Sequence, residues 1–152
     1  MTTADLEARP SGQPHCDVLI VEDDVLQAAE LADFLRRARL KVETFHDGSS
    51  GLHRAAVAHP RVAILDYNLP ALDGGQVAER IRAVSPHTAT IMISGRIDRP
   101  TDAVLTRLGV CAFSNKPLAL APLRALVGRL VHSSRHNGEP PVLPPREPAA
   151  FL

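Results

Sequence analysis

Five short apolar runs, each followed by a longer stretch with helical spacing, constrain the fold of this chain more than any other feature. The runs are residues 18–21, 42–45, 62–65, 90–93 and 110–113. Four of them consist almost entirely of Val, Ile, Leu and Ala, which is typical of strands buried on both faces of a parallel sheet. The second run alternates apolar and polar residues, and this pattern favours a position at the edge of the sheet.

The stretches between the runs place their apolar residues on one helical face. Leu31 and Leu35 do so in the first stretch, and the residues of 120–131 do so in the last. Asp47 and Thr101 are suited to cap two of these helices. Five strand-then-helix units predict an α/β fold, and right-handed crossovers place helices on both faces of an open sheet. We therefore predict a doubly wound, five-stranded parallel sheet, in which ligands bind at the carboxyl ends of the strands.

The length of 152 residues suits one domain with short extensions. Residues 1–16 are polar and show no regular period, which predicts a flexible lead-in. Residues 134–152 contain five of the 13 prolines, which predicts a disordered tail without helix or central strand. The expected domain therefore covers residues 17–133.

Charge and hydropathy narrow the expected partners and compartment. Lys and Arg number 17 and Asp and Glu number 17, so no net charge favours nucleic acid or an anionic membrane. The longest apolar run, 118–123, is far shorter than the roughly 20 residues that span a bilayer, so no membrane insertion is expected. The start of the sequence has no secretory leader, which favours the cytoplasm. Cys16 and Cys111 are too few for a disulfide framework and are expected to be thiols.

Polar side chains stand where the predicted strands end. Glu22 and Asp23 follow the first run, Asp66 the third, Ser94 the fourth, and Lys116 comes shortly after the fifth. The carboxyl ends of parallel strands meet at one edge, so three carboxylates would repel one another there unless a cation neutralises them. Lys116 supplies one positive charge, and the remaining negative charge suits a hard divalent cation, Mg²⁺ or Mn²⁺.

A carboxylate beside a divalent cation and a lysine is arranged to attack a phosphoryl group. Asp66 is the best candidate for the nucleophile because it stands alone at the end of a central strand, whereas Glu22 and Asp23 are better suited to hold metal. The product would be an aspartyl phosphate. Ser94 is placed to donate a hydrogen bond to it.

These segments resemble the receiver domain of two-component response regulators. The segments that carry the resemblance are 20–24 (IVEDD), 65–70 (LDYNLP), 73–74 (DG), 92–95 (MISG) and 116–117 (KP). The resemblance covers residues 17–133 and implies a flavodoxin-like (βα)5 fold with strand order 2-1-3-4-5. It further implies that Asp66 is the phosphoacceptor and that Lys116 pairs with the phosphoryl group.

The resemblance also assigns metal ligands. Asp23 and Asp66 would bind Mg²⁺ directly, Glu22 would act through water, and the backbone carbonyl of Asn68 would be a further ligand.

Two residues match the family's conformational switch. Ser94 occupies the position of the switch hydroxyl, and Phe113 that of the switch aromatic, which is often Tyr. Phenylalanine can fill the interior space but cannot make the hydrogen bond of a tyrosine hydroxyl. The bond between Lys116 and Pro117 is expected to be cis, as is typical of the family.

The resemblance therefore implies a phosphoacceptor that receives its phosphoryl group from the phosphohistidine of a histidine kinase or phosphotransfer protein. Phosphorylation would switch a protein-binding surface formed by the helix after Thr101, the strand 110–113 and the helix 120–131. This surface would bind a downstream protein, and it would also be the face for a homodimer. No DNA-binding output domain and no enzymatic activity beyond slow self-dephosphorylation are expected.

Two alternatives remain open at this point. One is a module that binds proteins without phosphorylation and keeps only the receiver fold. The other is a phosphohydrolase of the haloacid-dehalogenase type, which needs an acid two residues after its nucleophile. That position is Asn68 in this chain.

Overall fold

The computed structural model describes residues 16–95 and 100–137, with side chains described as far as residue 133. Within these ranges a five-stranded parallel sheet has the order β2-β1-β3-β4-β5. The strands are β1 (Val18–Val21), β2 (Val42–Phe45), β3 (Val62–Asp66), β4 (Ala89–Ser94) and β5 (Val110–Asn115). The predicted fold class and strand order are confirmed, and the alternating strand β2 lies at an edge of the sheet.

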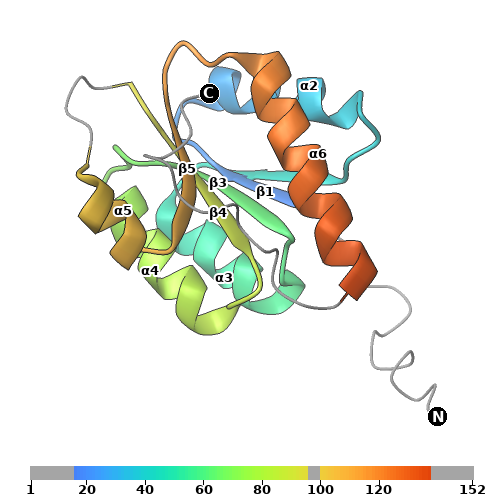
Figure 1. Ribbon diagram of the computed structural model, residues 1–152. Coiled ribbons are helices and arrows are strands. Elements are labelled where there is room, and N and C mark those ends of the chain that lie inside the picture. The colour runs from blue at the N-terminus through green and yellow to red at the C-terminus, as the bar shows by residue number, and fades with distance from the viewer. Residues whose placement is uncertain (1–15, 96–99, 138–152) are drawn as a thin grey trace.

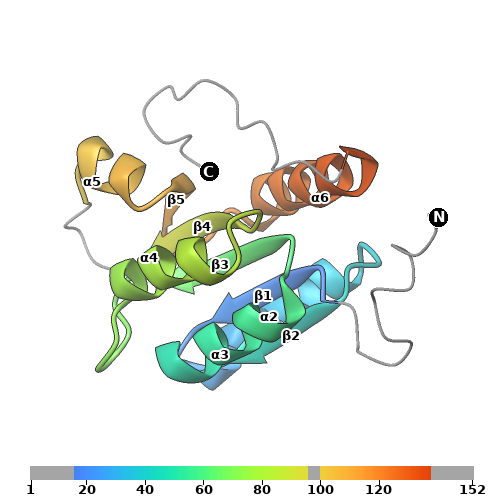
Figure 2. The ribbon, with the colours of Figure 1, turned by 90° about the horizontal axis from the view of Figure 1, so that it is seen from below.

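Helices cover both faces of this sheet (Figures 1 and 2). They are α2 (Val25–Arg36), α3 (Gly48–Ala58), α4 (Gly74–Val84), α5 (Asp102–Arg107) and α6 (Leu120–Asn137). Helices α2 and α6 pack on one face, whereas α3, α4 and α5 pack on the other. The molecule is therefore a three-layer α/β/α domain, as a parallel sheet buried on both sides requires.

Two hydrophobic clusters form, one on each side of the sheet. Ile20 of β1 belongs to the cluster beneath α2 and α6, and the neighbouring Leu19 belongs to the cluster beneath α3, α4 and α5. This alternation follows from the period of two along a strand. Both side chains are fully buried, and each such burial contributes about 1.5–3 kcal/mol.

Side-chain caps begin the helices where the sequence predicts them. Asp47 accepts a hydrogen bond from the Ser50 N–H at 2.8 Å, and Thr101 accepts one from the Val104 N–H at 3.2 Å. Capping by Asp and Thr at these positions satisfies backbone donors that have no partner within the helix. These caps fix the starts of α3 and α5.

Two expected boundaries are wrong. Cys16 does not belong to a flexible lead-in, because its side chain is 1% exposed within the second cluster and its thiol donates to the Val18 carbonyl at 3.3 Å. Helix α6 does not end at residue 133 but continues to Asn137. Neither glycine nor proline interrupts the chain between residue 129 and Gly138, so nothing in this stretch breaks the helix earlier. The rest of the expected lead-in and tail, 1–15 and 138–152, lies outside the described residues.

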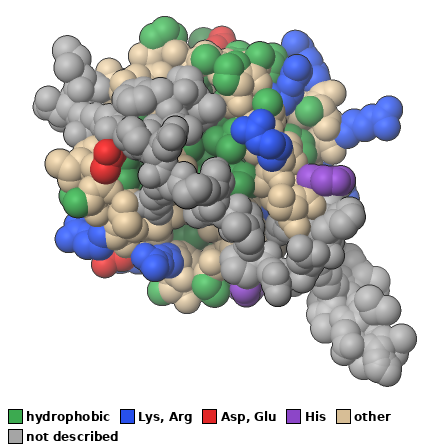
Figure 3. Space-filling view, viewed as in Figure 1, with side chains coloured by type: hydrophobic (Ala, Val, Ile, Leu, Met, Phe, Trp, Pro, Cys, Tyr) green, Lys and Arg blue, Asp and Glu red, His purple; other side chains and the backbone are tan. Residues whose placement is uncertain are grey.

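The outer surface carries mixed charge. Basic side chains gather towards the upper right of the space-filling view, near the end of α2 (Figure 3). Arg36, the last residue of α2, and Arg37 and Arg39 just after it are exposed, and Arg36 donates to the Val42 carbonyl at 2.8 Å. Among the helices of the described part of the chain, none is both long enough and apolar enough to cross a bilayer.

Candidate functional site

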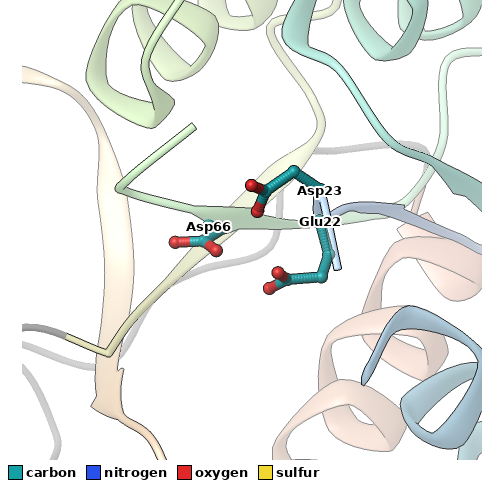
Figure 4. Close-up of side chains that lie close together, drawn as sticks. All are labelled: Glu22, Asp23 and Asp66. Atoms are coloured by element: carbon teal, nitrogen blue, oxygen red, sulfur yellow. The ribbon is translucent and has the colours of Figure 1, made fainter. Parts of the chain in front are cut away.

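The side chains of Glu22, Asp23 and Asp66 meet at the carboxyl edge of the sheet (Figure 4). Strands β1 and β3 are neighbours with Val21 opposite Leu65, so the residues that follow both strands emerge side by side. One oxygen from each of the three carboxylates lies within 4.8 Å of the others. The parallel register therefore brings together acids that are more than 40 residues apart in the sequence.

Lys116 bridges two of these acids. Its Nζ donates to Glu22 Oε2 at 2.7 Å and to Asp66 Oδ2 at 3.0 Å. The main-chain N–H of Lys116 donates to the Ser94 carbonyl at 2.8 Å, which holds the segment after β5 against the end of β4. The Lys116–Pro117 peptide bond is cis, the isomer expected from the resemblance.

Burial shapes the electrostatics of the pocket. Glu22 is 2% exposed and Asp66 is 3% exposed, whereas Asp23 is exposed. The pKa of Glu22 is raised to about 7, and burial is the largest cause. The hydrogen bond from Lys116 lowers this pKa, whereas the neighbouring Asp66 contributes to raising it. Burial lowers the pKa of Lys116, but its bonds to both carboxylates outweigh this effect and leave the pKa raised. The pocket thus holds more negative charge than Lys116 neutralises.

The loop after β3 holds the carboxylate of Asp66 in place. The N–H of Asn68 donates to Asp66 Oδ1 at 2.9 Å, and the N–H of Tyr67 donates to the Ile93 carbonyl at 2.8 Å. Gly74, the first residue of α4, approaches this loop so closely that a Cβ there would collide with the Asp66 carbonyl oxygen. Only glycine fits at this approach.

Ser94 lies at the end of β4, where the sequence places it, and its hydroxyl donates to Asn68 Oδ1 at 2.7 Å. The sequence analysis predicted no contact between the side chains of Asn68 and Ser94. It also missed His46, whose Nδ1 lies 3.0 Å from the Glu22 carbonyl oxygen. The available signal for His46 was its position just after β2, the strand that pairs with β1.

Phe113 lies in the interior. Its side chain is fully buried in the second cluster, and its residue pairs with Met92 across β4 and β5. The ring therefore already occupies an inward position in this structure. Of the expected site residues, six lie around one pocket, whereas Phe113 belongs to the core beside it. The six are Glu22, Asp23, Asp66, Asn68, Ser94 and Lys116.

The donor set of the pocket fits a hard divalent cation. Three carboxylates offer oxygen atoms close to one another, and oxygen is the ligand that Mg²⁺ prefers. Three carboxylates beside one lysine leave a surplus of negative charge, which such a cation would relieve. The exposed Asp23 leaves the pocket open to solvent on one side.

A doubly wound parallel sheet with an acidic pocket and a bridging lysine at its carboxyl edge defines a flavodoxin-like domain whose carboxylates could hold a cation. The family model for the response regulator receiver domain matches residues 18–128. The chain therefore belongs to the family of response regulator receiver domains. Receiver domains of this family are signalling domains of response regulators.

Two relatives of this chain are transcriptional regulatory proteins. The transcriptional regulatory protein CseB of Streptomyces avermitilis is 35% identical over 129 residues, which cover 81% of this chain and 54% of that protein. The transcriptional regulatory protein PrrA of Mycobacterium leprae is 32% identical over 114 residues, which cover 75% of this chain and 49% of that protein. The chain thus spans about half the length of the curated relatives that it matches.

Solved structures show the same fold. The CheY-like receiver domain protein of Methanospirillum hungatei superposes with a TM-score of 0.73 at 20% sequence identity, covering 80% of this chain and 98% of that chain. A likeness at this identity concerns the fold alone. It agrees with the strand order and the layers described above.

Proposed function

We propose that this domain accepts a phosphoryl group on Asp66 from the phosphohistidine of a histidine kinase or a histidine phosphotransfer protein. The observation that carries the proposal is the ammonium group of Lys116, which lies 2.7 Å from Glu22 and 3.0 Å from Asp66 at the edge where Asp23 also converges. A carboxylate nucleophile next to fixed positive charge is what an in-line phosphoryl transfer requires.

In this proposal Asp23, Asp66 and the backbone carbonyl of Asn68 hold Mg²⁺, with Glu22 acting through water. The ion would supply positive charge beside the oxygens of the transferred group. The N–H of Asn68 orients the Asp66 carboxylate, and Lys116 offsets the charge of the incoming phosphoryl oxygens. One Asp66 oxygen attacks phosphorus and forms the new P–O bond. The P–N bond to histidine breaks, and the imidazole leaves with the electron pair.

The phosphorylated state would act through the surface of α5, β5 and α6. Ser94 at the end of β4 pairs with Asn115 of β5, so a change at the serine has a direct route to this surface. The partner that reads the surface is a downstream protein, or a second copy of the chain in a homodimer. In this proposal the domain meets its phosphoryl donor in the cytoplasm.

The proposal is tested by incubating the protein with Mg²⁺ and acetyl phosphate and measuring its intact mass. The wild type should gain the mass of one phosphoryl group. Asp66→Asn should gain none, while Asp33→Asn, which removes a well exposed carboxylate on α2, should be labelled like the wild type. Labelling of Asp66→Asn equal to that of the wild type would disprove the role of Asp66.

The same experiment separates the alternatives. A protein-binding module that works without phosphorylation would show no labelling of the wild type under any of these conditions. A phosphohydrolase would instead turn over a generic phosphate ester at an enzymatic rate. The side chain two residues after Asp66 is the amide of Asn68, bonded to Ser94, and an amide cannot serve as a general acid.

A further inference from the structure

The backbone of Glu22 is held on both sides by the end of β2 and the residue that follows it. The Glu22 N–H donates to the Phe45 carbonyl at 2.9 Å, and the Glu22 carbonyl oxygen lies 3.0 Å from Nδ1 of His46. A carbonyl oxygen can only accept a hydrogen bond, so Nδ1 of His46 carries the proton and donates it. Glu22 is 2% exposed, so the imidazole satisfies a carbonyl that has little access to water.

The hydrogen bond from His46 bears on Asp23 through the peptide group that joins Asp23 to Glu22. The Glu22 carbonyl belongs to the same planar unit as the N–H and Cα of Asp23, so a donor on this carbonyl restricts the direction in which the Asp23 side chain leaves the backbone. Asp23 is exposed, and among the residues that the structure describes none donates a hydrogen bond to its carboxylate. The place of this carboxylate in the pocket therefore depends on the backbone.

We propose that His46 is a positioning residue for the metal site, because its imidazole holds the peptide between Glu22 and Asp23 and so directs Asp23 towards the divalent cation. This inference rests on the proposed function, in which Asp23 is a metal ligand. The Glu22 carboxylate is held separately, by Lys116 Nζ at 2.7 Å and by the Asp24 N–H at 3.1 Å. Loss of the imidazole should therefore displace the Asp23 carboxylate and leave that of Glu22 in place.

Two substitutions at position 46 separate the hydrogen bond from the bulk of the ring. His46→Asn keeps a donor, because the amide nitrogen of asparagine is as many bonds from Cα as Nδ1 of histidine. His46→Leu retains an apolar side chain of several atoms but has no donor. His87→Leu is the matched control, since His87 is an exposed histidine between α4 and β4, at the opposite edge of the sheet from the pocket.

The test is a titration of each protein with Mg²⁺, followed by the amide chemical shifts, which also show whether each variant is folded. His46→Leu should bind Mg²⁺ about tenfold more weakly than the wild type, as is typical when a group that orients a metal ligand is removed. His46→Asn should restore most of the affinity, and His87→Leu should bind like the wild type. Unaltered affinity of His46→Leu, or equal weakening by both substitutions at position 46, would overturn the inference.

A second measurement needs neither a variant nor a metal ion. The ring nitrogen chemical shifts of His46 in the metal-free wild type, recorded on the neutral imidazole, report which nitrogen carries the proton. The proton should be on Nδ1. A proton on Nε2 alone would overturn the inference, because two acceptors would then face each other at the Glu22 carbonyl.

The same proteins distinguish a failure of this inference from a failure of the proposed function. A wild type that binds Mg²⁺ but is not labelled by acetyl phosphate would overturn the phosphoryl transfer, while the affinities of the variants at position 46 would still decide the role of His46. A wild type that binds no Mg²⁺ at all would overturn both.

Discussion

The negative charge of Glu22, Asp23 and Asp66 exceeds the positive charge that Lys116 brings to the pocket. The carboxylate oxygens lie within 4.8 Å of one another, at which separation two like charges repel by about 1 kcal/mol even in a water-like dielectric. Asp23 is the exposed member of the set, so replacing its carboxylate with a neutral group should cost the fold little stability. The repulsion among the three carboxylates lowers the stability of the metal-free domain, and the same negative charge raises the affinity of the site for a cation.

Asp23→Asn should accordingly raise the free energy of unfolding in the absence of Mg²⁺, by up to about 1 kcal/mol, and weaken Mg²⁺ binding by about tenfold or more. Urea unfolding with a chelator measures the first effect, and a Mg²⁺ titration measures the second. Asp33→Asn, far from the pocket, is the control and should change neither. A destabilised Asp23→Asn with unaltered Mg²⁺ affinity would show that this carboxylate is a structural cap.

Which side chain bonds to which cannot be derived from the order of residues alone. The strand ends bring Glu22, Asp66 and Lys116 together, and that convergence follows from parallel pairing of apolar runs. The bond between Ser94 and Asn68 depends on side-chain rotamers within a few ångströms, and no spacing in the sequence encodes it. The convergence was predictable, whereas this contact was not.

Helices α3 and α6 each contain a glycine in a position where helix propensity favours another residue. Gly51 of α3 faces strand β1, and a Cβ at this position would lie 2.5 Å from Val21 Cγ2. Gly128 of α6 has no atom within 4 Å of the corresponding position. Close packing of helix on sheet therefore explains the first glycine but not the second.

Alanine at these two positions should have opposite effects. Gly128→Ala should raise the free energy of unfolding by up to about 1 kcal/mol, because alanine is the better helix former. Gly51→Ala should lower it by about 1–3 kcal/mol, because the fully buried Val21 has no room to move away. Thermal and urea unfolding of both variants supply the comparison. A stabilising Gly51→Ala would mean that α3 can shift outward from β1.

Strands and caps were predictable at the level of elements, because buried parallel strands leave near-continuous apolar runs and Asp47 and Thr101 are strong capping residues. The end of α6 was not. The prolines from Pro140 onward limit how far a helix can extend but do not determine where it stops, so the expected boundary fell four residues short of Asn137.

On the scale of the whole molecule, folding is linked to pH through Cys16. Burial raises the pKa of its thiol from 9.0 to about 12, with a further contribution from Glu43. The folded pKa lies above the unfolded value, so the stabilisation associated with the protonated thiol is complete below about pH 9. It is lost as the pH rises from there towards 12.

The free energy of unfolding should therefore decline at alkaline pH, by up to about 1 kcal/mol per pH unit from this group alone. Cys16→Ala lacks the titrating thiol and should show a smaller decline than the wild type over the same range. Urea unfolding of both proteins between about pH 8 and about pH 10.5 measures the difference. Parallel declines would show that the thiol is not buried in the folded state.

The close approach of Gly74 to the Asp66 backbone has a consequence for protein engineering. The N–H of Gly74 donates to the Tyr67 carbonyl at 3.1 Å, and any side chain at position 74 would strike the carbonyl of Asp66. The backbone of Asp66 therefore packs directly against the first turn of α4. A designer who transplants this acceptor onto another scaffold must move residues 66–74 as a single cassette, because an aspartate grafted alone would arrive without its support.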